Sequence, residues 1–156
     1  MLIANDVRDK LEEAVVELTD SFCYACYRIV KGTCCPHCGC DDLMRHLTGV
    51  GVEYGTNWVV QHWLTTMCTP VDEDDYFEDM LDDCYKPYEP FGGLCFTAGQ
   101  VLKAVDPVGF DVLKNEYMDT LVADGVLIEH EGKYYKVEEL ESIVNKLRMD
   151  KKETKQ

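Results

Sequence analysis

Two pairs of cysteines near the amino end constrain the fold of this chain more than any other feature. Each pair has the spacing Cys-x2-Cys, and eight residues lie between the pairs, whose members are Cys23, Cys26, Cys35 and Cys38. Two tight turns can each present two sulfur atoms, and four thiolates in a tetrahedron are common ligands of zinc. We therefore predict one structural Zn2+ ion in a closed site, with no position left for water or a substrate.

The spacing leaves some alternatives open. Cys34 and Cys40 lie beside the predicted ligands and His37 lies between two of them, so any of the three could replace a sulfur. Iron would accept the same four thiolates, and buried cysteines without a metal are the remaining alternative. A purely disulfide framework is disfavoured, because the cysteines number nine and five of them fall within sixteen positions.

The second cysteine pair also carries a family resemblance. The run Cys35-Pro36-His37-Cys38-Gly39 resembles the knuckle of zinc-ribbon and rubredoxin-like modules. In those modules the glycine after the second cysteine permits the backbone to approach the sulfur closely. The resemblance covers residues 21–45. Independently of it, the aromatic and β-branched residues of 21–31 predict a short hairpin that leads into the knuckle.

Acidic residues are concentrated in the middle of the chain. The net charge is −15, and residues 69–90 alone hold nine acidic residues and one basic residue. Residues 21–68 hold three of each, so the cysteine-rich region is not basic. Because nucleic-acid binding depends on positive charge, this distribution argues against direct contact with DNA or RNA.

Residues 72–84 combine this charge with a helical pattern. Apolar and sulfur-containing residues recur along one face, and acids cover much of the remainder, which predicts an amphipathic helix. One interpretation is a solvated helix face. The other is a surface for a partner protein with a basic surface, with carboxylates imitating phosphates. The candidate partner-binding residues are Asp72, Asp74, Asp75, Glu78, Asp79, Asp82 and Asp83.

The remaining patterns predict an α+β fold: an amino-terminal helix, the four-cysteine ribbon, the acidic helix, and carboxy-terminal helices with a β-hairpin. By composition the segments are 1–68 (helix and ribbon), 69–90 (acidic helix and linker), 91–150 (carboxy-terminal α+β module) and 151–156 (polar tail). Residues 48–56 are expected to form a glycine-rich turn, and Asn57 to cap the helix after it. Residues 86–93 are expected to form the linker.

The order of elements in the second half resembles a winged helix. A helix over 73–84, a strand at 94–96, helices over 97–104 and 108–123, and a hairpin over 126–137 follow one another in that fold. Thr97 and Gln100 have the spacing of a capping box, and Asp106-Pro107 is typical of a helix start. The inward positions of the third helix are predicted to be Phe110, Leu113, Tyr117 and Leu121. Its surface would be acidic, which favours protein contact over DNA contact.

No pattern indicates catalysis or membrane insertion. Cys68, Cys84 and Cys95 are isolated from any histidine or carboxylate partner, so the chain is not expected to be an enzyme. No run of about 18 apolar residues occurs, and the amino end lacks a secretory signal, so a cytoplasmic location is expected. The sequence specifies neither the partner nor the oligomeric state.

A second resemblance and the charge distribution together suggest a function. The helix after Asp106-Pro107 and the strand with Tyr134-Tyr135 resemble small uncharacterised bacteriophage proteins, a likeness that names no activity. We hypothesise a non-enzymatic binding protein, encoded by a phage and inhibiting a nucleic-acid-handling complex in the host cytoplasm. The alternative is a zinc-ribbon regulator that binds nucleic acid or acts in transcription.

Overall fold

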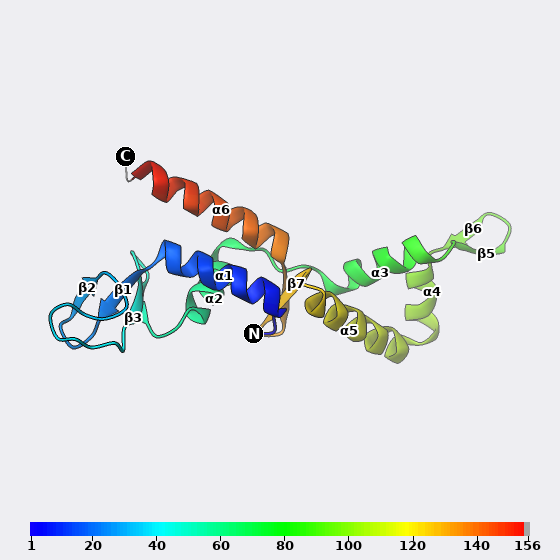
Figure 1. Ribbon diagram of the computed structural model, residues 1–156. Helices are drawn as coiled ribbons and strands as arrows, with labels where there is room; N and C mark the ends of the chain where they lie inside the picture. The colour runs from blue at the N-terminus through cyan, green and yellow to red at the C-terminus, as the bar shows by residue number, and fades with distance from the viewer. Residues whose placement is uncertain (155–156) are drawn as a thin grey trace. The chain divides into compact units, whose positions relative to one another are not determined.

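In the computed structural model, residues 1–154 are described, and the chain divides into two compact units (Figure 1). Unit 1 contains Met1, Asn5–Thr69 and the carboxy-terminal chain from Val137, and unit 2 contains Leu2–Ala4 and Pro70–Lys136. Six helices and three small antiparallel sheets occur in the described part of the chain. The predicted α+β class is confirmed, including the order of amino-terminal helix, cysteine-rich strands and carboxy-terminal helices.

The core of unit 1 is built from three helices that contact one another in pairs. They are α1 (Asn5–Leu18), α2 (Asn57–Met67) and α6 (Val137–Thr154). In each helix the buried residues recur at spacings of three or four, as in Leu11 and Ala14 of α1 and Leu140 and Val144 of α6. Trp63 of α2 is among the largest fully buried side chains. Burial of these apolar faces stabilises the helices.

Two helix ends in unit 1 differ from the sequence-based expectation. Asn57, expected as a cap, is the first residue of α2, and Thr56 occupies the cap position without a side-chain hydrogen bond. Residues 151–154, expected as a polar tail, continue α6, and residues 155 and 156 lie outside the described part of the chain. Lys151 and Lys152 suit this position because cations are favourable in the last turn of a helix.

The cysteine-rich region forms a four-stranded antiparallel sheet with the order β2-β1-β3-β4. Its strands are β1 (Asp20–Cys23), β2 (Arg28–Val30), β3 (Met44–Leu47) and β4 (Gly51–Glu53). The predicted hairpin over residues 21–31 is the β1–β2 pair. The expected turn at 48–56 is only partly correct, because the chain turns around Gly49 and then pairs as β4. Short strands with few apolar residues give little signal in a sequence.

Unit 2 is organised around α3 (Glu73–Cys84), α4 (Ala98–Val105) and α5 (Pro107–Ala123). Phe77 of α3, Leu81 of α3 and Phe110 of α5 form one buried cluster, in which the two phenyl rings meet edge to face with centroids 5.1 Å apart. Strands β7 (Leu127–His130) and β8 (Lys133–Lys136) follow α5 as the predicted hairpin. Leu127 packs with Met118 and Val122 in a second cluster.

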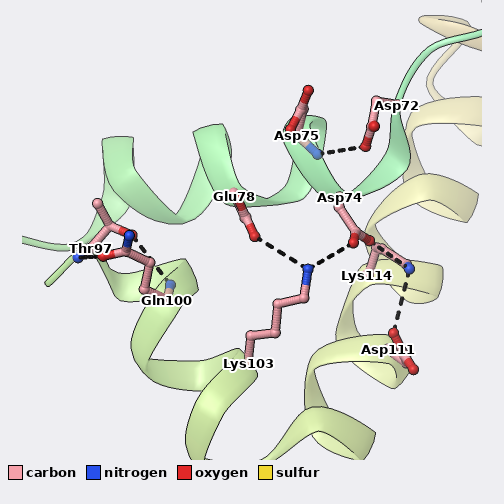
Figure 2. A network of polar contacts seen from close by, with 9 residues as sticks. All are labelled: Asp72, Asp74, Asp75, Glu78, Thr97, Gln100, Lys103, Asp111 and Lys114. Carbon is pink, nitrogen blue, oxygen red and sulfur yellow. Dashed lines mark hydrogen bonds and ion pairs between the residues drawn. The ribbon is translucent and has the colours of Figure 1, made fainter.

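Side-chain caps start all three helices of unit 2. The Asp72 carboxylate accepts a hydrogen bond from the Asp75 N–H, and Asp106 accepts one from the Gly109 N–H. The capping box of Thr97 and Gln100 is confirmed, with both reciprocal hydrogen bonds present (Figure 2). Each cap satisfies backbone donors that a helix leaves free in its first turn.

The structure corrects two details of the second half. Leu113 is 46% exposed, whereas Met118 and Val122, which were not predicted to face inward, are buried. At 3.6 residues per turn, Leu113 lies about 60° outside the arc that Phe110, Met118 and Val122 occupy around α5. The expected linker contains strand β5 (Tyr88–Phe91), which pairs with β6 (Leu94–Phe96).

This pairing also differs from the winged-helix order of elements. The strand expected at 94–96 is β6, and it pairs with β5, which precedes it and was not part of the expected order. The β7–β8 hairpin is extended by a bridge between Leu2 and Glu129, and Tyr134 accepts a hydrogen bond from the Val71 N–H at 2.8 Å. The β5–β6 hairpin forms its own two-stranded sheet between α3 and α4 in the chain (Figure 1).

Candidate metal centre and acidic surface

The four predicted cysteines come together in unit 1, with their sulfur atoms all within 4.8 Å of one another. The Sγ atoms of Cys23 and Cys38 are 3.6 Å apart, and those of Cys26 and Cys35 are 3.8 Å apart. A tetrahedral zinc ion with Zn–S bonds of about 2.3 Å requires sulfur atoms about 3.8 Å from one another. No cysteine of the chain is in a disulfide. The four thiols are therefore positioned to hold one metal ion.

The two cysteine turns share a backbone feature. The residue after the second cysteine of each pair has a positive φ, namely 53° at Tyr27 and 74° at Gly39. Glycine adopts this conformation without steric cost, whereas a side chain there is disfavoured. The Tyr27 ring packs against Phe22 with centroids 5.4 Å apart, which helps to hold the first turn in this conformation. The glycine expected from the zinc-ribbon resemblance thus has a geometric reason.

The thiols affect one another's ionisation. The backbone N–H of Cys38 is the main cause that lowers the pKa of Cys35 to about 7. Hydrogen bonding with Cys38, together with burial, raises the pKa of Cys26 to about 12. Neighbouring thiolates repel, so ionisation of Cys35 disfavours ionisation of Cys26. A bound dication would stabilise the thiolates and release the thiol protons.

The three alternative ligands lie outside the four-sulfur group. The ring of His37 accepts a hydrogen bond at Nε2 from the Arg28 guanidinium, 3.2 Å away. Cys40 packs against the cysteine cluster, but its thiol points to the Asp42 carbonyl at 3.9 Å. Cys34 is exposed. The four sulfur atoms that lie close together are therefore those of Cys23, Cys26, Cys35 and Cys38.

Arg45 of β3 fixes the sheet to the end of α1, and sequence reasoning missed it. Its guanidinium donates to the carbonyls of Val16 and Thr19 at 3.0 and 2.8 Å and to the Thr19 hydroxyl at 2.8 Å. A further bond reaches the Ser21 hydroxyl at 3.1 Å. A cation is favourable at these carbonyls because they form the negative end of the helix dipole. The only sequence signal is that Arg45 is one of three basic residues in 21–68.

In unit 2, three of the seven candidate acidic residues hold α3 in place. Asp72 caps the helix. The Asp74 carboxylate pairs with Lys103 of α4 at 3.0 Å and with Lys114 of α5 at 2.8 Å, and Glu78 lies 3.9 Å from Lys103 (Figure 2). Hydrogen bonding to Lys114, and then to Lys103, lowers the pKa of Asp74.

These two lysines were also missed, although the sequence carried a signal for them. Lys103 and Lys114 are the only basic residues between Lys86 and Lys133. In a segment so rich in acids, each is expected to meet a carboxylate, but which carboxylate depends on how the helices pack. Lys114 also pairs with Asp111 at 3.4 Å.

The other four acids are exposed, and none of them makes an ion pair with another residue among 1–154. These residues, Asp75, Asp79, Asp82 and Asp83, are called the acidic stripe below. At 3.6 residues per turn they occupy an arc of about 100°. The arc lies opposite Phe77 and Leu81, which are buried. The acidic stripe is thus a continuous charged face whose charge is not neutralised by its own unit.

The three cysteines outside the ribbon, Cys68, Cys84 and Cys95, differ in burial. Burial raises the pKa of Cys68 to about 11, so its thiol is protonated at neutral pH. Cys84 and Cys95 are exposed. Within residues 1–154, no helix has the length and apolar character needed to cross a bilayer.

Comparison with protein-family models, with curated proteins and with solved structures gives no match to this chain. The resemblance to bacteriophage proteins therefore gains no support from these comparisons. What the structure itself establishes is a four-cysteine cluster that is positioned to hold one metal ion.

Proposed function

We propose that this chain is a non-enzymatic zinc-containing protein that binds a partner protein with a basic surface and excludes nucleic acid from it. The observation that carries the proposal is the acidic stripe, whose four carboxylates are exposed and have no ion pair within residues 1–154, while Asp74 and Glu78 beside them are held by lysines. Complementary charge accelerates association and selects the partner.

The spacing of the acidic stripe supports a phosphate-like role. Residues 75 to 83 span about 12 Å of helix axis, which places the four charges about 4 Å apart on average. One strand of B-DNA carries a phosphate about every 3.4 Å along its axis. A groove that binds a nucleic-acid strand through lysine and arginine would meet a similar density of negative charge on α3. The proposed consequence is that this chain, as a phage-encoded protein, inhibits a nucleic-acid-handling complex of the host.

Neutralising the acidic stripe tests this proposal. In the variant Asp75→Asn, Asp79→Asn, Asp82→Asn and Asp83→Asn, we expect capture of basic host proteins to fall at least about tenfold. Captured proteins should also be released by duplex DNA and by raised salt, because both compete with surface charge. The measurement is quantitative affinity capture, followed by competition with DNA for each captured protein.

A matched variant separates the acidic stripe from net charge. Asp9→Asn, Glu12→Gln, Glu13→Gln and Glu53→Gln neutralise four exposed acids of unit 1 and reach the same net charge. Capture should survive in this control. Equal loss in both variants, or a partner that DNA does not displace, would contradict the proposal.

The ribbon suggests a second candidate function. Tyr24 and Tyr27 are 66% and 76% exposed beside Arg28, and exposed aromatic rings near basic residues can stack on unpaired bases. If the ribbon binds unpaired bases through these rings, the protein should retard a single-stranded oligonucleotide in a gel at low salt. The variant Tyr24→Ala should weaken this complex. Clear binding by this route would favour a nucleic-acid-binding ribbon over the inhibitor.

A further inference from the structure

A pocket of about 380 Å³ lies between α3 and α5 in unit 2. Five lining residues come from one side of α3, at positions i, i+3, i+4, i+7 and i+8, and one comes from α5. They are Tyr76, Asp79, Met80, Asp83, Cys84 and Tyr117. The pocket shares Asp79 and Asp83 with the acidic stripe, so it opens directly beside that surface.

The lining combines two kinds of chemistry. Two tyrosine rings and the Met80 thioether provide apolar and polarisable walls. Asp79 and Asp83 stand one helical turn apart, and both carboxylates are exposed and unpaired among the described residues. Aromatic faces and carboxylates both attract cations, whereas an anionic group would be repelled by the two acids.

Each of the two tyrosine rings contacts a residue of another element. The Lys136 ammonium of β8 lies 5.8 Å from the centroid of the Tyr76 ring. Lys136 does not line the pocket, but its position shows that this ring accepts a cation. The Tyr117 ring lies against Phe77 with centroids 6.1 Å apart. Burial raises the pKa of Tyr117, and its phenol therefore remains neutral at physiological pH.

From these features we infer that the pocket receives the long cationic side chain of a lysine or arginine from the partner. The alkyl stem would lie against Met80 and the rings, and the charged head would reach Asp79 and Asp83. The inference rests on the proposed function. It adds that one lysine or arginine of the basic partner binds in the pocket, while the rest of the partner's positive surface faces the acidic stripe. It adds a requirement for stem length, which the exposed acidic stripe does not impose.

Two peptides of equal charge distinguish the pocket from the acidic stripe. Pentalysine and a pentapeptide of 2,4-diaminobutyrate carry the same number of ammonium groups, but the second has a stem two methylenes shorter. We expect pentalysine to bind the full chain about tenfold more tightly, with NMR shifts at Met80 and Tyr117. The measurement is titration at a pH where all side-chain amines are charged.

Variants at Cys84 provide the structural control. Cys84 is exposed and its sulfur lies 3.8 Å from that of Met80, so Cys84→Phe should fill the pocket without changing charge. This variant should abolish the tenfold preference for pentalysine over the shorter peptide. Cys84→Ala, which leaves the pocket open, and Cys95→Phe, which adds a ring on exposed β6, should retain it. If Cys84→Phe is not folded by circular dichroism, Cys84→Leu serves as the filling variant.

The outcomes separate the two proposals. Equal affinity for both peptides, or an unchanged preference in the filled variant, would overturn the pocket and leave the acidic stripe in place. If neutralising the acidic stripe weakens pentalysine no more than the matched unit 1 variant does, the proposed function fails as well. Loss of the preference only in the filled variant supports the pocket.

Discussion

Asp74 joins three helices of unit 2 through a single carboxylate. It lies on α3, while its partners Lys103 and Lys114 come from α4 and α5. Lys114 is only 15% exposed at its side chain, so this pair is screened less by water than an ordinary surface pair. Asp74 therefore has a structural role that its exposed neighbours on α3 do not share.

The lowered pKa of Asp74 predicts a pH dependence for unit 2. The folded state binds the Asp74 proton more weakly than the unfolded state, so the stabilisation is present above about pH 4 and is lost as the pH falls through the lowered pKa. Asp74→Asn should reduce the free energy of unfolding at pH 7 by up to about 1 kcal/mol. Urea unfolding followed by NMR signals of Phe110 should show this difference shrinking near pH 3.

Asp79→Asn is the matched control, because that carboxylate has no ion pair in the described part of the chain. Two results would argue against a structural role for the Asp74 pairs. One is an Asp74→Asn variant as stable as wild type at pH 7, and the other is a variant whose free energy of unfolding falls toward pH 3 as much as that of wild type.

Arg45 is the corresponding residue of unit 1. Because its guanidinium donates four hydrogen bonds at the end of α1, Arg45→Ala should lower the free energy of unfolding by about 2 kcal/mol. Both tryptophans of the chain, Trp58 and Trp63, lie in α2, so tryptophan fluorescence during urea unfolding reports on unit 1. Arg28→Ala removes one contact to His37 and should have little effect by comparison.

At the scale of elements, the second cysteine turn depends on a left-handed residue. A Cβ at Gly39 would meet no atom within 4 Å, so Gly39→Ala should act only through backbone strain at φ +74°. We expect a loss of about 1 kcal/mol in the stability of the metal-loaded protein, measured by tryptophan fluorescence. Gly51→Ala, at an open position of unit 1 without a positive φ, should leave the stability unchanged.

The acidic helix α3 carries charge at an unfavourable end. Glu73, Asp74 and Asp75 in its first turn suit the positive end of the helix dipole, whereas Asp82 and Asp83 lie next to its negative end. Replacing both by Asn should raise the free energy of unfolding of unit 2 by about 0.5 to 1 kcal/mol, measured by urea unfolding with NMR detection. Unaltered stability combined with unaltered partner capture would remove any special role for this end of α3.

At the scale of the whole molecule, the metal centre and the acidic stripe belong to different units. Cys23, Cys26, Cys35 and Cys38 all lie in unit 1, and α3 lies in unit 2. The metal should therefore stabilise the ribbon directly, since binding free energy of a structural zinc is partly folding free energy.

Removing the metal tests this division. After treatment with a chelator, amide hydrogen exchange should accelerate in the β1–β2 hairpin and around Cys35, and α3 and α5 should keep their protection. Cys23→Ser should behave like the chelated protein, and Cys34→Ser, outside the cluster, like wild type. Two results would contradict a structural metal: purified protein with less than about half an equivalent of metal per chain, or amide hydrogen exchange in the ribbon that the chelator does not change.

Much of the fold was predictable because its signals are local. The cap at Asp106 and the capping box of Thr97 each act within three residues, so the sequence carries them directly. The two Cys-x2-Cys turns are local in the same sense, and their spacing specifies four sulfurs that can converge.

Other features depend on contacts between distant residues. The exclusion of His37 and Cys40 from the metal cluster follows from where Arg28 and Asp42 lie. Strand β4 forms by pairing with β3, and strand β5 pairs with β6 in a segment that was expected to be a linker. None of these outcomes has a signature within a short stretch of sequence.

By itself, the sequence determined the helices, the caps of α4 and α5, the cysteine turns and the concentration of acid on α3, because propensity, capping and ligand spacing act over a few residues. Only the tertiary structure decided that α6 packs with α1 and α2, that Arg45 joins the ribbon sheet to α1, and which acids on α3 remain free. The physical reason is that ion pairing and burial are set by which helices meet. Two lysines from other helices neutralise Asp74, and the acidic stripe is what remains exposed.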